Sequence, residues 1–141
     1  VTVSVLYWSR VPPLRDMSFD EIGKGFTGQY YATMQSDRSQ CAGIYRPNSL
    51  MTYNGTQLQG TDDIMQHLTG LGIDGIVYQV QDTDCHPTST GGVLAVVNGE
   101  LKLPGEDHSL TFNDVFNLAL DEQGNYYVAN QLSRVLGGGS H

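Results

Sequence analysis

Hydrophobic positions in the first third of the chain recur at the spacing of an α-helix. Phe19, Ile22, Phe26, Tyr30 and Met34 follow one another at intervals of three or four residues. On a helix of 3.6 residues per turn, this spacing places them in a single apolar stripe. The pattern therefore predicts an amphipathic helix with one buried face near the start of the chain.

Local signals indicate where this helix begins and how it packs. Ser18 is a suitable N-cap, and Glu21 three residues later completes a capping box. Gly23, Gly25 and Gly28 lie inside the predicted helix, where each glycine costs up to about 1 kcal/mol of helix propensity. Packing against a sheet must compensate for that cost. Glycines of this kind often permit a helix to approach a sheet closely.

Three shorter elements follow. The segment from Ser39 to Tyr45 is predicted to be a short helix that stops before a proline. Asn54-Gly55 lies between two short β-prone arms and predicts a two-residue hairpin with a type I′ turn, which requires positive φ at both residues. Thr61 is the expected N-cap of a further helix. Its inward residues are predicted to be Ile64, Met65, Leu68 and Leu71.

The second half of the chain changes to strand-like patterns separated by polar turn clusters. The predicted strands are 76–80, 93–103, 110–120 and 126–135, and the turn clusters are 86–92, 104–107 and 121–125. A chain whose helices come first and whose long antiparallel strands come last is typical of the α+β fold class. We therefore predict a curved antiparallel meander wrapped around the long N-terminal helix. The other sheet face is then exposed or paired with a second copy.

Composition limits the classes of partner. The chain has 141 residues, a formal net charge of −8 and only 16% charged residues. One domain is expected over 17–136, with 1–16 interpreted as an extension or vector-derived segment and 137–141 as a linker and tag remnant. The acidic balance argues against binding to nucleic acid or to an anionic membrane surface. No segment approaches the roughly 20 apolar residues of a membrane-spanning helix.

Candidate catalytic and metal-binding chemistry is sparse. Cys41 and Cys85 are too few and too far apart for a disulfide scaffold or a zinc site, and free buried thiols are expected. The histidines share no metal-like spacing, so neither a metal nor a cofactor is predicted. Every second residue from Asp82 to His86 is polar, so Asp82, Asp84 and His86 share one face of a strand. This pattern suits either an acid/base pair or the polar end of a strand. We favour the polar strand end.

An ordered set of residues resembles the nuclear transport factor 2 family. It runs from about Phe19 to Arg134 and includes Asp37-Arg38, Asn54-Gly55, Leu58-Gln59-Gly60, His86-Pro87, Val96-Val97-Asn98-Gly99 and Val115-Phe116. The resemblance implies a cone-like curved antiparallel sheet wrapped around a long N-terminal helix, with a mouth at one end. It also implies a homodimer formed through the sheet face. It further implies that the protein is not an enzyme but a nuclear import carrier, and that this carrier binds the GDP form of the small GTPase Ran. Such a carrier works in cytoplasm and nucleus and crosses the nuclear pore on phenylalanine-glycine (FG) repeats of nucleoporins.

The resemblance places the Ran contact at the first hairpin. In family members an aromatic residue there lines a cavity that accepts an aromatic side chain of Ran, and Tyr53 stands at this position in place of the usual Trp. The alternative is a half-buried strand Tyr whose ring packs on the following helix. The next family residue is acidic and pairs with a basic residue of Ran, but here it is Asn54. Its turn conformation alone accounts for an Asn at that position.

Further family positions carry over with changes. A second acidic site for Ran corresponds to Glu106 and Asp107, in a loop that is one residue longer. From the residues alone, a solvated turn is the favoured interpretation of this pair. The nucleoporin contact corresponds to Phe19, again in place of Trp, where a core role is the alternative. Ser133 replaces a packing Phe near the end of the match, which suggests repacking nearby.

Two alternative functions remain open on the same fold. One is an interaction module, such as the cofactor of an mRNA-export receptor or a peptide-binding domain. The other is a ketosteroid-isomerase-like enzyme, which needs a buried general base in the cone. The residues available for that chemistry are Tyr30, Tyr53, Asp84 and Asp114. Fold analogy alone supports the enzyme.

Overall fold

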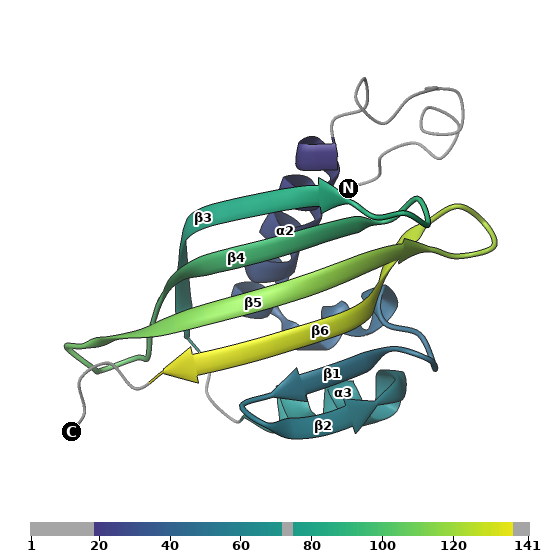
Figure 1. Ribbon diagram of the computed structural model, residues 1–141. Coiled ribbons are helices and arrows are strands. Elements are labelled where there is room, and N and C mark those ends of the chain that lie inside the picture. Colours follow the sequence, from purple (N-terminus) through teal and green to yellow (C-terminus); the bar gives the residue numbers. More distant parts are fainter. Residues whose placement is uncertain (1–18, 72–74, 137–141) are drawn as a thin grey trace.

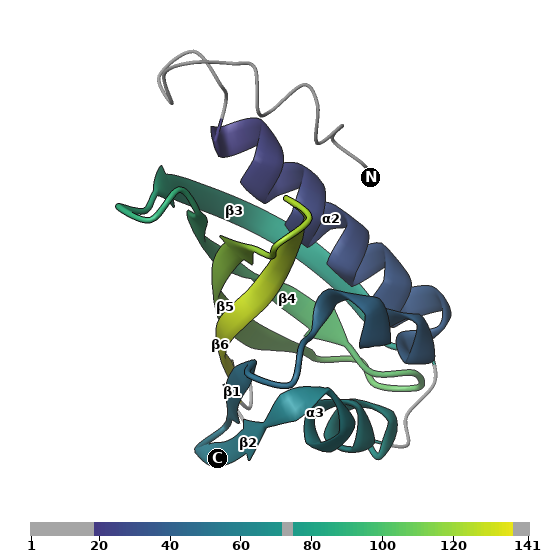
Figure 2. The ribbon, with the colours of Figure 1, turned by 90° about the vertical axis from the view of Figure 1, so that its right-hand side faces the viewer.

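Six strands form one strongly curved sheet, and the helices lie against one of its faces (Figures 1 and 2). The computed structural model describes residues 19–71 and 75–136. Along the chain the elements are α2 (Phe19–Ser36), the 3₁₀-helix η2 (Arg38–Ile44), β1 (Leu50–Tyr53), β2 (Thr56–Gln59), α3 (Gly60–Thr69), β3 (Val77–Pro87), β4 (Val93–Lys102), β5 (Ser109–Leu120) and β6 (Tyr126–Leu136). This arrangement confirms the predicted α+β fold.

The strand order in the sheet is β2-β1-β6-β5-β4-β3. β1 pairs with β6 in parallel, and the other neighbours are antiparallel. The register shifts between Val80 and Asp82 in β3, and between Asn117 and Leu118 in β5 opposite β6. Such irregularities bend strands and increase their twist, so they help the long strands to curve around α2.

The core lies between α2 and the inner face of the sheet. Alternate residues of β4 and β5 point inward, and the largest fully buried side chains include Phe112, Phe116 and Leu118. From α2, the buried residues include Ile22, Tyr30 and the adjacent Tyr31. Tyr31 lies outside the predicted apolar stripe, yet it is buried like Tyr30 because the curved sheet covers more than one side of the helix.

Of the three helix glycines, only Gly23 serves a close approach. A Cβ added at Gly23 would lie 2.3 Å from the Cys85 sulfur on β3. A Cβ added at Gly25 or Gly28 would meet no atom within 4 Å. Cys85 and Cys41 are both free and buried, as predicted.

Several element boundaries differ from the sequence predictions. The third helix begins at Gly60 with Gln59 as N-cap and without a side-chain cap bond, so Thr61 is not its cap. β3 extends to Pro87, because ladder pairing with β4 continues through residues predicted to form a turn. The expected cap residue Ser18 and the end segments 1–16 and 137–141 lie outside the described residues.

The two ends of the sheet carry different elements. At one end, which we call the mouth end, β1 and β6 finish and β4 turns into β5. At the other, the helix-start end, α2 begins beside β3, and β5 turns into β6. α2 runs between the two ends. Gly23, near the start of α2, packs on Cys85 near the end of β3. Gln35, near the end of α2, accepts a hydrogen bond through its side chain from the Tyr78 N–H near the start of β3.

Candidate functional site at the mouth of the cone

The predicted hairpin forms and closes the mouth end of β1. Tyr53 pairs with Thr56, and the two residues between them have φ values of 48° for Asn54 and 89° for Gly55. Positive φ at both central residues is the signature of a type I′ turn. Asn and Gly adopt this conformation at the least steric cost, which explains why the turn was predictable.

Asn54 also ties the hairpin to β6. Its backbone N–H donates to the Ser133 carbonyl over 2.9 Å, and its side-chain oxygen accepts from the Val135 N–H over 2.8 Å. Asn54 thus has a structural role in addition to its turn conformation. Its side chain is exposed at the mouth, but one of its acceptor positions is already occupied.

Tyr53 is half-buried beside the following helix. Its ring centroid lies 4.7 Å from that of His67 on α3, with the planes tilted by 58°. Burial raises the pKa of the Tyr53 hydroxyl, with a further contribution from Asp114, while Arg38 opposes the shift. The His67 Nε2 atom is buried and has no hydrogen-bond partner among the described residues. The half-buried Tyr53 ring thus keeps part of its surface accessible at the mouth. It also packs on α3, as expected for the alternative of a half-buried strand tyrosine.

A buried carboxyl group lies behind Tyr53. Tyr53 is paired with Ser133 on β6, and Ser133 with Asp114 on β5, so the three form one row across adjacent strands. Asp114 is only 6% exposed and accepts hydrogen bonds from the Tyr31 hydroxyl and the Ser133 side chain. Burial raises the pKa of the Asp114 carboxyl to about 6, although both hydrogen bonds lower it.

This carboxyl group belongs to a larger buried polar cluster. The Gln131 side chain accepts from the Tyr45 hydroxyl over 2.7 Å. It donates to the Tyr30 hydroxyl and to the Ser133 hydroxyl, each over 3.2 Å. The cluster connects α2, the end of η2, β5 and β6, so each buried polar group has a partner. We name this set of residues the interior polar cluster: Tyr30, Tyr31, Tyr45, Asp114, Gln131 and Ser133.

Sequence reasoning did not identify most of this cluster. Ser133 was noted only as a replacement for a packing Phe, and Gln131 was not singled out. The available signal was the alternation of β6, in which Val128, Gln131, Ser133 and Val135 occupy the inner face around the β-bulge. A polar residue at an inward strand position implies a buried hydrogen-bond partner. The Ser133 side chain bonds with Gln131 and with the Asp114 carboxyl group, so polar contacts occupy the position where the resemblance expects a packing Phe.

The remaining predicted site residues divide between the two ends. Glu106 and Asp107 are exposed in the turn between β4 and β5, at the same end as the Asn54 turn. Phe19 begins α2 at the helix-start end and is half-buried against the core. The structure therefore has Tyr53, Asn54 and the turn with Glu106 and Asp107 at one end of the sheet, and Phe19 at the other.

The candidate acid/base pair on β3 does not enter the cone. Asp82, Asp84 and His86 are exposed, whereas Cys85 between them is buried. Within residues 19–71 and 75–136, no group of three or more His, Cys, Asp or Glu side chains is placed to hold a metal ion. The helices in these ranges include none long and apolar enough to span a membrane.

Comparison with known proteins identifies the family. The family model of the nuclear transport factor 2 (NTF2) domain matches residues 22–135, which is most of the chain. The chain belongs to the nuclear transport factor 2 family. Nuclear transport factor 2 of Schizosaccharomyces pombe is 38% identical over 118 residues, covering 83% of this chain and 95% of that protein. Nuclear transport factor 2B of Arabidopsis thaliana is 34% identical over 123 residues, covering 86% and 98%.

A solved structure agrees with this assignment. Nuclear transport factor 2 from Cryptosporidium parvum superposes with a TM-score of 0.80 at 32% identity, covering 84% of this chain and 95% of that one. A putative ketosteroid isomerase from Shewanella frigidimarina shares the fold at a TM-score of 0.70 but only 9% identity, covering 82% and 97%. The relatives that share a third of the sequence are named transport factors, which supports a role in nuclear transport.

Proposed function

We propose that this NTF2-family protein is an import carrier that binds the GDP form of Ran and crosses the nuclear pore on FG-repeat nucleoporins. The observation that carries the proposal is the aromatic ring of Tyr53 at the mouth of an NTF2-family cone. Tyr53 is half-buried, so one part of its ring is anchored on α3 while another part is accessible to a partner. Anchored aromatic side chains of this kind are the usual energetic centre of an interface.

The charged residues of the proposed Ran site lie at the rim of the mouth. Glu106 and Asp107 stand on the exposed β4–β5 turn, at the same end of the sheet as the Asn54 turn. Rim charges steer encounter more than they add affinity. We propose that Glu106 and Asp107 supply the attraction for a basic patch of Ran, and that Asn54 contributes hydrogen bonds only.

The nucleoporin contact is proposed at the other end of the molecule. Phe19 lies at the first position of α2 and is half-buried. Because it is remote from Tyr53 along the sheet, binding of an FG repeat there leaves the mouth free for Ran. A carrier needs this separation, since both partners are held during passage through the pore. We propose that the protein works in the cytoplasm, the nucleus and the pore, and is not an enzyme.

A homodimer is proposed through the outer face of the sheet, which no described helix covers (Figure 1). Val96, Val115 and Leu132 are cross-strand neighbours on β4, β5 and β6, and Leu132 is 54% exposed. Asn98 and Asn113 pair by a side-chain hydrogen bond beside this apolar row, as do Asn117 and Asn130. An apolar row flanked by polar groups is the usual composition of an interface.

Nucleotide-dependent binding of Ran tests the proposal. We expect Ran loaded with GDP to bind in a pull-down and in calorimetry, and Ran loaded with GTP to bind much more weakly. Tyr53→Ala should weaken GDP-Ran binding at least tenfold, the effect of losing an interface anchor worth about 1.4 kcal/mol or more. Tyr126→Ala, at the helix-start end, is the matched control and should leave this binding unchanged. Equal binding of both nucleotide forms would refute the carrier function.

A further inference from the structure

The Asn54-Gly55 turn exposes a chemically reactive pair of residues at the mouth. Both residues are exposed, with φ values of 48° and 89°. The hydrogen bond that closes such a turn uses the N–H of the next residue, so it does not engage the Gly55 nitrogen. Glycine has no side chain to shield that nitrogen from the side-chain carbonyl carbon of Asn54. The Gly55 nitrogen is therefore a nucleophile next to an amide group, in contact with water.

The Val135 N–H activates the side-chain carbonyl group of Asn54. It donates a hydrogen bond to the Asn54 Oδ1 atom over 2.8 Å. Attack by a nitrogen on this carbonyl group places negative charge on its oxygen, and a donor already aimed at that oxygen stabilises the charge. The Asn54 N–H donates to the Ser133 carbonyl group, which holds the backbone of the same residue. The strand beside the hairpin thus supports attack on the Asn54 amide.

The reaction that these groups support is deamidation. The Gly55 nitrogen gives its proton to water and bonds to the Asn54 Cγ atom, while the bond from Cγ to Nδ2 breaks and the amide leaves as ammonia with a proton from water. Water then opens the resulting cyclic imide on either side of the Gly55 nitrogen. Breaking the bond to Cγ gives aspartate, and breaking the bond to the main-chain carbonyl carbon gives isoaspartate. One water is consumed and one ammonia is released, with no oxidant or reductant.

A second Asn-Gly pair in the chain is protected by the fold. Asn98 and Gly99 lie inside β4, which pairs with β3 on one side and β5 on the other. Gly99 is buried, and a Cβ added there would lie 2.3 Å from the Gln79 carbonyl oxygen. The Asn98 side-chain oxygen accepts a hydrogen bond from the Asn113 amide. Ring closure would rotate the Gly99 peptide out of the ladders, so this pair should be unreactive in the folded protein.

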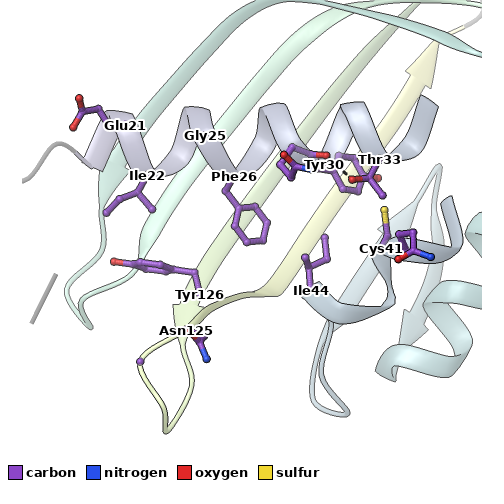
Figure 3. Close-up of a pocket in the computed structure, with 13 residues that line it drawn as sticks. Glu21, Ile22, Gly25, Phe26, Tyr30, Thr33, Cys41, Ile44, Asn125 and Tyr126 are labelled. Atoms are coloured by element: carbon purple, nitrogen blue, oxygen red, sulfur yellow. Dashed lines mark hydrogen bonds between the residues drawn. The ribbon is translucent and has the colours of Figure 1, made fainter. Parts of the chain in front are cut away.

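Asn125 separates the effect of exposure from that of the following glycine. It lies in the β5–β6 turn and is exposed, like Asn54. Figure 3 shows that the next side chain, Tyr126, projects from the start of β6 toward Ile22 of α2. Tyr126 is also paired with Leu120 on β5, which fixes its backbone. Because a side chain and a strand pairing restrict the attacking nitrogen, Asn125 should react slowly despite its exposure.

We propose that Asn54 is a site of spontaneous deamidation, through which the mouth of the cone acquires a carboxylate with time. The new group adds one negative charge to the net −8 of the chain. In the aspartate form, the carboxylate still accepts the Val135 N–H, now as a charge-assisted hydrogen bond. In the isoaspartate form, the main chain is one carbon longer, so the turn no longer matches the pairing of Tyr53 with Thr56. The inference does not depend on the Ran-carrier proposal.

Incubation of the full chain in heavy-oxygen water at mildly alkaline pH tests the proposal. Samples are digested in ordinary water and analysed by mass spectrometry, so only deamidation during the incubation carries the heavy oxygen. We expect Asn54 to deamidate at least tenfold faster than Asn98 and Asn125, with one heavy oxygen in each product. In urea, the rate at Asn98 should rise to within twofold of that at Asn54, while Asn125 stays slow. Equal rates at Asn54 and Asn98 in the folded protein would overturn the proposal.

Two glycine variants identify the attacking atom. Gly55→Ala adds a side chain beside the attacking nitrogen and should slow deamidation of Asn54 at least tenfold. Gly105→Ala is the matched control, because Gly105 has a φ of 81° and does not follow an asparagine, and a Cβ added at either glycine would meet no atom within 4 Å. Both variants carry similar backbone strain, and thermal unfolding should show both folded. Gly105→Ala should change the rate less than twofold, and equal slowing in both variants would overturn the proposal.

Ion-exchange chromatography separates the two products from the unmodified chain and tests their effect on the hairpin. The Asn54→Asp variant supplies the authentic aspartate form, and an isoaspartyl methyltransferase labels the isoaspartate form. In urea unfolding, the aspartate form should have a midpoint equal to or above that of the unmodified chain, and the isoaspartate form a lower one. Equal midpoints for the two products would overturn the inferred difference between them.

Discussion

The two ends of the cone differ in what lies behind their openings. At the mouth end, the half-buried Tyr53 stands in front of Ser133 and the buried Asp114 carboxyl. At the helix-start end, Tyr126 faces Phe26 across an apolar cavity. Both ends thus present an aromatic ring, but a polar interior supports one and an apolar cleft surrounds the other. The difference shows that one fold holds a polar interior at one end and an apolar cavity at the other, through the residues that the helices and strands bring together there.

This contrast follows from the packing of α2. At the mouth end, the Tyr31 hydroxyl reaches Asp114, so the helix is held to the sheet through polar groups. At the helix-start end, Gly23 brings the helix against Cys85, and contact is direct. Close approach on the β3 side leaves the opposite side of the helix, with Gly25 and Phe26, bordering an open cavity.

The largest expected effect concerns the buried carboxyl group at the mouth end. The pKa of Asp114 is about 6 in the folded protein against 3.8 for the free group. The folded state therefore holds this proton more tightly, so the free energy of unfolding falls as pH rises from about 4 to about 6 and is level above that. The loss is about 3 kcal/mol at most. Asp114→Asn should abolish this slope and stabilise the protein at pH 7, as measured by urea unfolding at several pH values.

Tyr31→Phe provides the control for that measurement. It removes one hydrogen bond to the Asp114 carboxyl group but keeps the carboxyl group itself. The pH dependence should persist in this variant, because the carboxyl group still titrates in a buried site. An unchanged slope in Asp114→Asn would show that another group causes it, and the interior polar cluster would then not distinguish the mouth end.

A second prediction compares two glycines on α2. Gly23→Ala places a methyl group 2.3 Å from the Cys85 sulfur, so the helix or the strand must shift. Overpacking of this kind costs about 1–3 kcal/mol, partly offset by up to about 1 kcal/mol of helix propensity. Gly25→Ala meets no atom within 4 Å and should stabilise by about 0.5–1 kcal/mol. Urea unfolding of both variants measures the difference.

Removing the opposing sulfur tests the cause. In the double variant Gly23→Ala with Cys85→Ala, the methyl group no longer meets the sulfur, and part of the lost stability should return. If Gly23→Ala and Gly25→Ala change stability equally, then α2 has no tightly packed side at the helix-start end. The open cavity would then need another explanation than the position of the helix.

A third prediction addresses the charge missing from the mouth. Asn54→Glu restores an acidic residue beside Tyr53 and should tighten GDP-Ran binding by up to tenfold, if about 1.4 kcal/mol is recovered. The same change should lower the free energy of unfolding by about 1 kcal/mol, because a glutamate tolerates the φ of 48° less well than asparagine. Calorimetry and urea unfolding measure the two effects. Unchanged or weaker binding would place Asn54 outside the Ran contact.

The sequence predicted those parts of the fold that local rules determine. The apolar stripe of α2 and the Asn54-Gly55 turn were found because each depends on the spacing or backbone conformation of neighbouring residues. The end of β3 was missed, since His86-Pro87 resembles a turn until the ladder with β4 is known. The cap of α3 was misplaced for a similar reason, because Gln59 closes the hairpin and starts the helix at once.

The candidate sites were less predictable than the fold. Tyr53 was proposed through the family resemblance, at a hairpin that its Asn54-Gly55 turn makes recognisable. The row that joins it to Ser133 and Asp114 depends on the strand register, which brings together residues distant in the sequence. The cavity beside α2 depends on Gly25, Ile44 and Tyr126, three residues whose proximity only the packing of three elements creates.

The smallest effect is expected from an aspartate at the helix-start end, whose pH response is opposite to that of Asp114. The Asp121 carboxylate accepts hydrogen bonds from the N–H groups of Asn125 and Gln123 and from Arg46. These bonds, the Asn125 N–H first, lower the pKa of Asp121 below 3.8. Its stabilising contribution is therefore complete above about pH 4 and is lost as pH falls through the lowered pKa.

Asp121→Asn keeps an acceptor for the turn but loses the ion pair with Arg46. It should change stability little at pH 7 and reduce the loss of stability between pH 5 and pH 3 in urea unfolding. A slope of the same sign as that of Asp114 would show that the two ends do not differ in how they hold their carboxyl groups.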